Sequence, residues 1–179
     1  MNKAMNTTNT ANKRLNVKTI AVTAMFAALI YAATAFLHIP TINGYVHLGD
    51  ALIYLAASVL PIPYGLIAAG LGGFLADALT GYMIFAPGTL IVKVLLTIAF
   101  TSKREKMICP RNLIAVLIAF PITIGGYFLY SWIVFDFASA FAEILSNLGQ
   151  AAGSAVLYIV LAFALDRIGF KKKLSKLNG

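Results

Sequence analysis

Residues 94–120 read VLLTIAFTSKREKMICPRNLIAVLIAF, two apolar runs on either side of a short basic segment. That segment contains Lys103, Arg104, Lys106 and Arg111. Soluble proteins spread their charges over the whole surface, whereas the Lys and Arg residues of a membrane protein gather in loops on its cytoplasmic side. This stretch therefore predicts two membrane-spanning helices joined by a cytoplasmic loop.

The other basic residues are distributed in the same way. All but one of the 14 Lys and Arg residues fall in three polar segments, at the N-terminus, in the middle and at the C-terminal end. The two outer segments contain Lys3, Lys13, Arg14 and Lys18, and Arg167, Lys171, Lys172, Lys173 and Lys176. Three basic segments on one side of a membrane need an even number of crossings between them, so both termini are expected in the cytoplasm.

The composition excludes a soluble globular protein. Hydrophobic residues make up 60% of the 179 residues, which leaves too few polar side chains to cover a soluble surface. Membrane topology and anionic lipid headgroups explain the net charge of +8 better than nucleic acid does, because the basic residues show no interleaved aromatic pattern. With Cys109 as the single cysteine, no intramolecular disulfide can form, and we expect no metal or cofactor site.

Six apolar segments are long enough, or nearly so, to span a bilayer. The expected helices cover residues 18–37, 46 or 50–60, 64–79, 89–102, 112–135 and 143 or 144–168. The outer loops, around residues 38–49, 80–88 and 136–143, contain no Lys or Arg. The sequence thus predicts an all-α bundle of six transmembrane helices over residues 18–169, between a disordered cytoplasmic leader, 1–17, and a basic cytoplasmic tail, 170–179. A secretory signal over residues 20–37 is the alternative for the first run, which is long for that role.

Polar residues at membrane depth are costly, so each is a candidate for a functional site. Glu143, Asn147, Gln150 and Ser154 recur at spacings of 4, 3 and 4, which places them on one face of the last helix. We expect this face to line a polar cavity, with hydrogen bonding between helices as the alternative.

Lys93 is the one cation inside an apolar segment. Its ammonium group needs a carboxylate, a water-filled cavity or an anionic ligand. The available carboxylates are Asp77 and Asp50, and an ion pair with Asp77 is the structural alternative to ligand contact. The complete set of expected binding residues, which includes loop and aromatic residues near the outer surface, is Asn43, His47, Asp50, Tyr54, Tyr82, Lys93, Tyr127, Glu143, Asn147 and Gln150.

Small residues recur every fourth position in two helices. Gly65, Ala69 and Gly73 lead to Asp77, and this line permits close packing of helices. In the first helix the line is formed by Ala24, Ala28 and Ala32, which either pack inside the bundle or dock another membrane protein. No GxxxxGK[ST] phosphate loop is present, so an ATP cycle would need other chains.

Several short motifs occur in order along the chain: HLGDAL at 47–52, YG at 64–65, GG at 72–73, Asp77 with TGY at 80–82, APGT at 86–89 and IVK at 91–93. Together with AMFAA at 24–28, they resemble the substrate-binding S components of energy-coupling-factor (ECF) vitamin transporters. The resemblance covers residues 18–168 and is closest to the riboflavin branch. Pyridoxine, hydroxymethylpyrimidine, pantothenate, queuosine-type and cobalamin carriers share much of the pattern.

The resemblance implies a multi-pass protein of the cytoplasmic membrane that is not an enzyme. It implies a vitamin site in the outer half, closed by the first and third external loops and lined by helices four to six. The alanine motif would contact a transmembrane coupling subunit, and two cytoplasmic ATPases would complete the importer. The alternatives are a membrane enzyme using Asp50, Asp77 and Lys93, which lack a companion nucleophile–base or metal set, and a gradient-driven carrier, for which no inverted repeat is evident.

Overall fold

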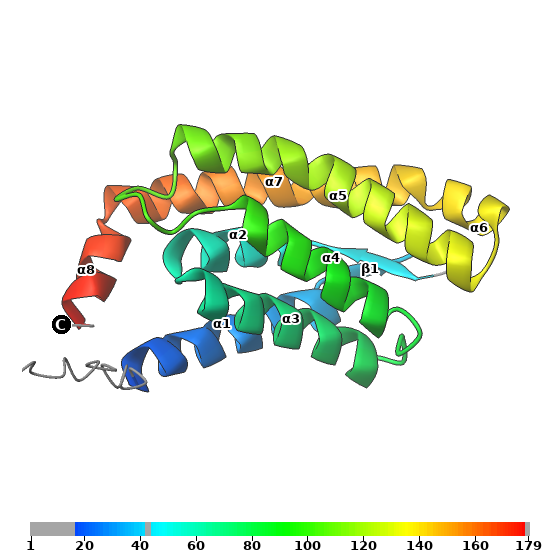
Figure 1. Ribbon diagram of the computed structural model, residues 1–179, viewed down its shortest axis with the longest axis horizontal. Helices are drawn as coiled ribbons and strands as arrows, with labels where there is room; N and C mark the ends of the chain where they lie inside the picture. Colours follow the sequence, from blue (N-terminus) through cyan, green and yellow to red (C-terminus); the bar gives the residue numbers. More distant parts are fainter. Residues whose placement is uncertain (1–16, 42–43, 178–179) are drawn as a thin grey trace, which may run out of the picture.

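The computed structural model describes residues 17–41 and 44–177, so the predicted leader, apart from its last residue, and the candidate Asn43 lie outside the described residues. The helices are α1 (Val17–Phe36), α2 (Gly49–Val59), α3 (Ile62–Leu79), α4 (Ala86–Ala99), α5 (Pro110–Val134), α6 (Phe137–Ala142), α7 (Ile144–Arg167) and α8 (Phe170–Leu177). The longer helices run along the long direction of the molecule, and α8 turns away from it at one end (Figure 1). Strands β1 (His38–Pro40) and β2 (Tyr45–His47) form an antiparallel hairpin.

Four parts of the described chain are long and apolar enough to cross a membrane. They are α1, α3, α5 and the segment Phe137–Arg167, which contains α6 and α7. Helices α2 and α4 are apolar too, but they have 11 and 14 residues, fewer than the ~20 of a full span. The predicted apolar helical bundle is therefore confirmed, and two of its helices are short.

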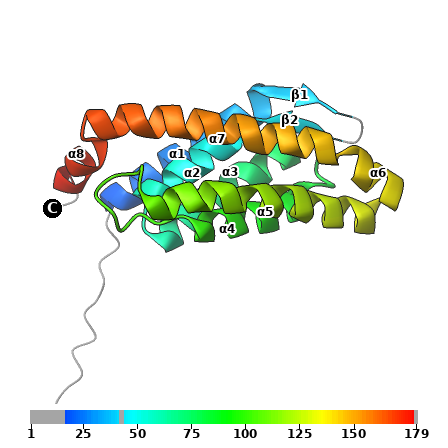
Figure 2. The same cartoon turned by 90° about the horizontal axis from the view of Figure 1, so that it is seen from above.

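Helix α2 lies at the centre of the bundle. Each helix contacts the next in the order α1, α3, α4, α5, α7 and α2, and α2 in turn contacts α1. Helix α2 also packs against α3 and α4. Figure 2 shows the same bundle from above, with α2 partly covered by α7. Buried residues occupy most of α2, from Gly49 to Ser58. Because α2 is surrounded by other helices, it is apolar on nearly all sides.

The predicted line of small residues in α3 packs inside the bundle. Gly65, Ala69 and Gly73 are all buried, as is Asp77 at the end of the line. A Cβ atom built on the neighbouring Gly72 would lie 2.8 Å from the backbone oxygen of Ala27 in α1. Such a distance is shorter than side chains adopt, so glycine is what allows α1 to approach α3 this closely.

Several expected boundaries are wrong, and prolines explain two of them. Helix α3 begins at Ile62 and α4 at Ala86, so Pro63 and Pro87 lie in first turns. Proline is tolerated there because the first turn of a helix does not use its N–H groups. The hairpin and α6 lie in two segments that were predicted as outer loops, residues 38–49 and 136–143.

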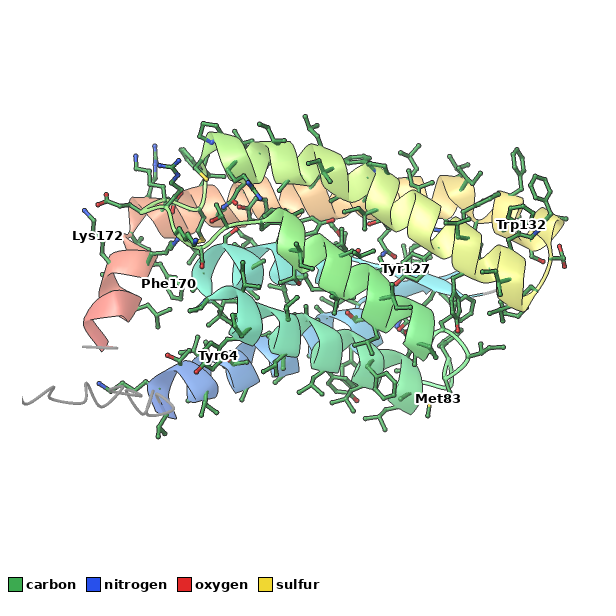
Figure 3. All side chains as sticks on the ribbon, in the orientation of Figure 1. Tyr64, Met83, Tyr127, Trp132, Phe170 and Lys172 are labelled. Carbon is green, nitrogen blue, oxygen red and sulfur yellow. The ribbon has the colours of Figure 1, made fainter. Side chains whose placement is uncertain are left out.

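The two ends of the bundle differ in chemistry. Lys172 lies at one end, among nitrogen-bearing side chains, and Trp132 lies near the other (Figure 3). At the Lys172 end, the carboxylate of Asp166 accepts hydrogen bonds from the backbone N–H groups of Met107 and Ile108, both at 2.9 Å. These bonds attach the basic loop between α4 and α5 to the end of α7.

Candidate functional site

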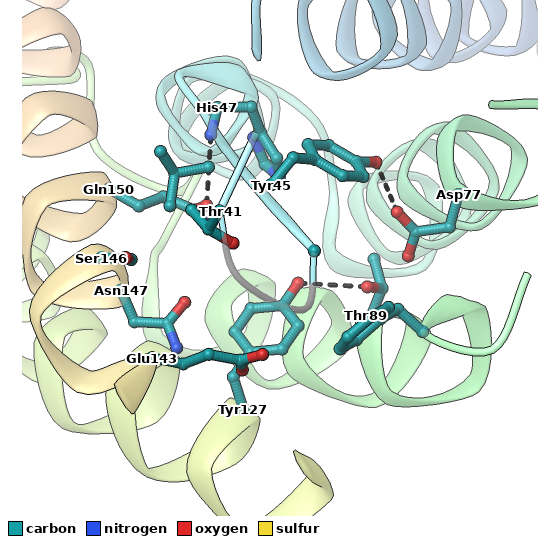
Figure 4. A pocket seen from close by; sticks show the side chains of 13 residues that line it. Thr41, Tyr45, His47, Asp77, Thr89, Tyr127, Glu143, Ser146, Asn147 and Gln150 are labelled. Carbon is teal, nitrogen blue, oxygen red and sulfur yellow. Dashed lines mark hydrogen bonds between the residues drawn. The ribbon is translucent and has the colours of Figure 1, made fainter. Parts of the chain in front are cut away.

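A small cavity lies beneath the hairpin, between β2, α3, α4, α5 and α7 (Figure 4). Its volume is about 30 Å³, which leaves room for no more than a few water molecules. Its walls are formed by Thr41, Gly44, Tyr45, Val46, His47, Asp77, Phe85, Thr89, Tyr127, Glu143, Ser146, Asn147 and Gln150. Most of these side chains carry a polar group, so the cavity is built for hydrogen bonding.

Helix α7 provides one wall through the polar face predicted from its periodicity. Glu143, Asn147 and Gln150 all line the cavity, and Ser154 is buried one turn further along. Their common inward orientation is confirmed. The hydroxyl of Ser131 in α5 donates a hydrogen bond of 2.7 Å to Oε2 of Glu143, which positions that carboxyl group against the wall.

The hairpin covers the cavity and is attached on two sides. The backbone N–H of His47 donates to Oε1 of Gln150 at 3.2 Å, and the hydroxyl of Tyr45 donates to Oδ1 of Asp77. These two bonds connect β2 to α7 and to α3. Burial, together with the nearby Asp77 carboxyl, raises the pKa of Tyr45 above its ordinary value, so the phenol remains a donor.

His47 is held as an uncharged imidazole. Its Nδ1 accepts a hydrogen bond of 3.1 Å from the backbone N–H of Gly49. Burial, followed by the positive charge of Lys93, lowers the pKa of His47 to about 3, and the nearby Asp50 offsets only part of this shift. The imidazole therefore contributes no positive charge to the cavity near neutral pH.

A buried ion pair lies next to the cavity wall. Nζ of Lys93 is 2.6 Å from Oδ1 of Asp50, and both side chains are fully buried. Nε2 of Gln150 donates to Oδ2 of Asp50 at 2.9 Å, which connects the pair to the α7 wall. The ion pair with Asp77, which was the structural alternative to ligand contact, is wrong, because Lys93 pairs with Asp50. Helix α2 packs against α4 and presents Asp50 to Lys93, whereas Asp77 receives its hydrogen bond from Tyr45.

Tyr127 joins the ion pair to the cavity. Its ring lies 5.2 Å from Nζ of Lys93, and its hydroxyl is 3.1 Å from that of Thr89. Tyr127 lines the cavity, whereas Lys93 and Asp50 do not. These two predicted site residues contact the lining residues Tyr127 and Gln150 rather than the cavity itself.

Two predicted aromatic residues lie outside the cavity. Tyr82 packs against the ring of Tyr45 at 4.6 Å and belongs to the outer cover. Tyr54 is fully buried and stacks on Phe100 at 4.8 Å, toward the other end of the bundle. The direct lining therefore includes His47, Tyr127, Glu143, Asn147 and Gln150 from the predicted set.

The sequence matches the family described as ECF-type riboflavin transporter, S component, over residues 14–167. This match covers most of the chain. The chain belongs to this family. S components are membrane proteins that bind vitamin substrates and work with ECF modules, and they are not enzymes. A search of curated proteins finds no match.

Several lining residues of this S component were not selected from the sequence. Thr41, Gly44, Val46 and Ser146 are adjacent in sequence to polar or aromatic residues but belong to no recognisable pattern. Thr89 lies in the APGT motif, and Tyr45 and Phe85 belong to the aromatic residues near the outer loops. These last three residues therefore belonged to groups that the sequence analysis had noted. The spacing of residues in the sequence does not show which members of such a group point into the cavity.

The alanine motif of the S component lies on the outside of α1. Ala24 and Ala28 are exposed, and Ala32 is half-buried. The inward face of α1 is formed by other residues, including Phe26 and Ile30. The packing of helices within this chain therefore does not cover the outward alanines.

Among the described residues, no three His, Cys, Asp or Glu side chains are grouped so that they could hold a metal ion.

Proposed function

We propose that this S component captures riboflavin in the cavity beneath the hairpin and delivers it across the cytoplasmic membrane with ATPase-driven partners. The observation that carries the proposal is the polar face of α7, where Glu143, Asn147 and Gln150 line a cavity in a chain of the riboflavin family. Aromatic lining residues, such as Tyr45, Phe85 and Tyr127, supply rings against which a flat flavin can stack.

The proposed topology places the hairpin end outside and the basic end in the cytoplasm. Six crossings, by α1, α2, α3, α4, α5 and α7, bring both termini to the cytoplasmic side. The basic loop between α4 and α5 and the end of α7 lie together at the Lys172 end, which agrees with the positive-inside bias. The short α2 and α4 cross within the bundle, where other helices or locally thinned lipid cover their ends.

Riboflavin entry requires the walls of the cavity to move apart. A three-ring flavin is far larger than the few water molecules that fit in about 30 Å³. The hairpin is the wall attached by single side-chain hydrogen bonds, from His47 to Gln150 and from Tyr45 to Asp77. We therefore assign the opening movement to strands β1 and β2.

The outward alanines of α1 form the proposed docking face for the transmembrane coupling subunit. Ala24, Ala28 and Ala32 present small side chains, which permit a second helix to approach closely. Two cytoplasmic ATPases would supply the energy through that subunit. Work with ECF modules is a property of the family, which argues against a gradient-driven carrier acting alone.

Mass spectrometry of the compound that co-purifies with the protein tests the proposal. We expect riboflavin, recognisable by its yellow colour, and we expect Gln150→Leu and Asn147→Leu to lose it while remaining folded. Gly149→Leu is the matched control, because a Cβ atom at this exposed position of α7 meets nothing within 4 Å. Retention of riboflavin by both polar variants would remove α7 from the site, and a different bound vitamin would replace the proposed substrate.

A further inference from the structure

A second hollow lies at the other end of the bundle, in the loop between α4 and α5 and at the start of α5. Its volume is about 290 Å³, whereas the cavity beneath the hairpin has about 30 Å³. We call it the basic hollow, and it is lined by Thr101, Lys103, Arg104 and Arg111. Three of these four residues carry a positive charge and none carries a negative one, so the basic hollow favours an anion.

The three cations of the basic hollow are not neutralised within the described part of the chain. There, none of Lys103, Arg104 and Arg111 forms an ion pair with an acidic residue. A neighbouring hollow at the same end also has basic walls, but Glu105 and Asp166 line it as well. Uncompensated positive charge is therefore concentrated in the basic hollow rather than spread evenly over this end of the bundle.

A buried side chain, that of Asn112, fixes the backbone around the basic hollow. Its Oδ1 accepts a hydrogen bond of 2.8 Å from the N–H of Thr101, and its Nδ2 donates to the carbonyl oxygen of Thr101 at 3.2 Å. The hydroxyl of Thr101 accepts a hydrogen bond of 3.3 Å from the N–H of Lys103. Nε of Arg111 donates to the carbonyl oxygen of Ala99 at 3.4 Å, which connects the start of α5 to the end of α4. Because the backbone is fixed, binding costs less conformational entropy.

Exposed apolar side chains continue from the basic hollow along both helices. In α5, Ile114 and Ile118 follow Arg111 at spacings of 3 and 4, which places all three on one face. Their exposed fractions are 55% and 43%. In α4, Leu95 and Ile98 are 46% and 49% exposed. Such faces of a membrane protein contact acyl chains, so a molecule bound here meets positive charge at one end and apolar surface along the rest.

We propose that the basic hollow binds the phosphate group of an anionic phospholipid, whose acyl chains lie along the exposed faces of α4 and α5. The guanidinium group of Arg111 can bind two phosphate oxygens at once, and basic pockets between transmembrane helices suit acidic headgroups. A soluble phosphate would contact only the cations, whereas a phospholipid also contacts the apolar faces. Since none of the four residues lines the cavity beneath the hairpin, this inference does not depend on which vitamin the chain binds.

Native mass spectrometry of the full-length protein in detergent tests this preference. Phosphatidylglycerol is anionic and phosphatidylcholine has no net charge, so with matched acyl chains the ratio of their dissociation constants reports the headgroup. We expect phosphatidylglycerol to bind on the order of 100-fold more tightly, because each of three cations near an anionic lipid is worth about fivefold. Lys103→Gln, Arg104→Gln and Arg111→Gln should each reduce this ratio by about fivefold. Arg111→Lys keeps the charge but not the paired contact, so it should reduce the ratio by only about twofold.

Lys106→Gln is the matched control. It removes one charge from the same loop, but Lys106 lines the neighbouring hollow together with Glu105 and Asp166. Its effect on the ratio should be less than about twofold, because charges at a distance are screened. All the replaced side chains are exposed, so the core of the bundle is unchanged. Equal affinities for the two lipids in the unmodified protein would overturn the proposal, as would a reduction by Lys106→Gln as large as that by Arg111→Gln.

Two further measurements separate a phospholipid from other anionic ligands. Phosphatidylglycerol should raise the unfolding temperature, whereas inorganic phosphate in large excess should not, relative to chloride at the same ionic strength. An equal rise with inorganic phosphate would assign the basic hollow to a soluble phosphate and overturn the proposal. Unchanged binding of phosphatidylglycerol by an Arg111→Gln protein that has lost uptake in cells would assign the hollow to an acidic protein partner and overturn it too.

Discussion

Lys93 of α4 and Asp50 of α2 form an ion pair of 2.6 Å in which neither side chain is exposed. Gln150 donates to the second oxygen of Asp50, and its own oxygen accepts from the backbone of His47 in the hairpin. One hydrogen-bonded path therefore leads from the buried charges to the cover of the cavity. Gln150 thus links the buried ion pair to the hairpin by two hydrogen bonds.

Removal of only one charge of this pair should be strongly destabilising. Lys93→Met leaves Asp50 buried without its counter-charge, and we expect a loss of about 3–5 kcal/mol in the free energy of unfolding. The double variant Lys93→Met with Asp50→Asn removes both charges and keeps an acceptor for Gln150. It should recover much of the loss in a thermal unfolding experiment, and a double variant as unstable as Lys93→Met would show that the charge itself is not the cause.

Acidification should weaken the closed position of the hairpin through His47. Its pKa is about 3 in the folded protein and about 6.5 when exposed, so the unfolded state binds more protons between these values. The stabilisation is complete above about pH 6.5 and is lost as the pH falls toward 3, with about 2 kcal/mol lost by pH 5. The groups that act on this imidazole are Lys93, Asp50 and His38.

Unfolding temperatures at pH 7.5 and pH 5 measure this effect. His47→Asn keeps an acceptor for the N–H of Gly49 but does not titrate in this range, so its unfolding temperature should fall less between the two pH values. Other acidic groups affect both proteins equally. The same fall in both proteins would contradict the assignment to His47.

Bulk on the outward face of α1 should separate ligand binding from transport. Ala24→Trp and Ala28→Trp place a large ring at exposed positions where close docking is proposed, so binding by the purified subunit should persist while uptake in cells is lost. Ala164→Trp, at an exposed position of α7, is the control and should leave uptake intact. Normal uptake by both α1 variants would place the docking surface elsewhere.

Two helical glycines should respond oppositely to alanine. At Gly72 the new Cβ atom would lie 2.8 Å from the backbone oxygen of Ala27, so Gly72→Ala should cost about 1–3 kcal/mol of stability. At Gly125 nothing lies within 4 Å, so Gly125→Ala should be neutral or stabilising by up to about 1 kcal/mol. Thermal unfolding distinguishes the two, and an equally stable Gly72→Ala protein would mean that α1 moves away without cost.

Local patterns predicted the part of the site that lies on one helix. Glu143, Asn147 and Gln150 share the inner face of α7 because side chains at helical spacing must lie on one side. The partner of Lys93 could not be predicted in this way. Asp50 and Asp77 both carry a carboxylate that could pair with Lys93. Which of them does so depends on how α2 packs against α4.

The positions of prolines and loop residues also could not be predicted from local sequence patterns alone. Pro87 lies in the segment predicted as an outer loop, residues 80–88, but the first turn of α4 accommodates it because its missing N–H is not needed there. Thr41 and Val46 line the cavity only because the hairpin folds back over the bundle. A contact made by such a fold has no periodic signal in the sequence.

The sequence by itself determined that this chain is a helical membrane protein, and its motifs indicated the riboflavin S-component family. A bilayer acts on each segment separately, so the hydropathy and flanking charge of a segment are sufficient to assign it. Only the tertiary structure decided that Asp50 neutralises Lys93, that Tyr45 hydrogen-bonds to Asp77 and that Asp77 faces the same cavity as Glu143. These relationships join residues far apart in the chain, and their geometry is set by the packing of helices that no single segment specifies.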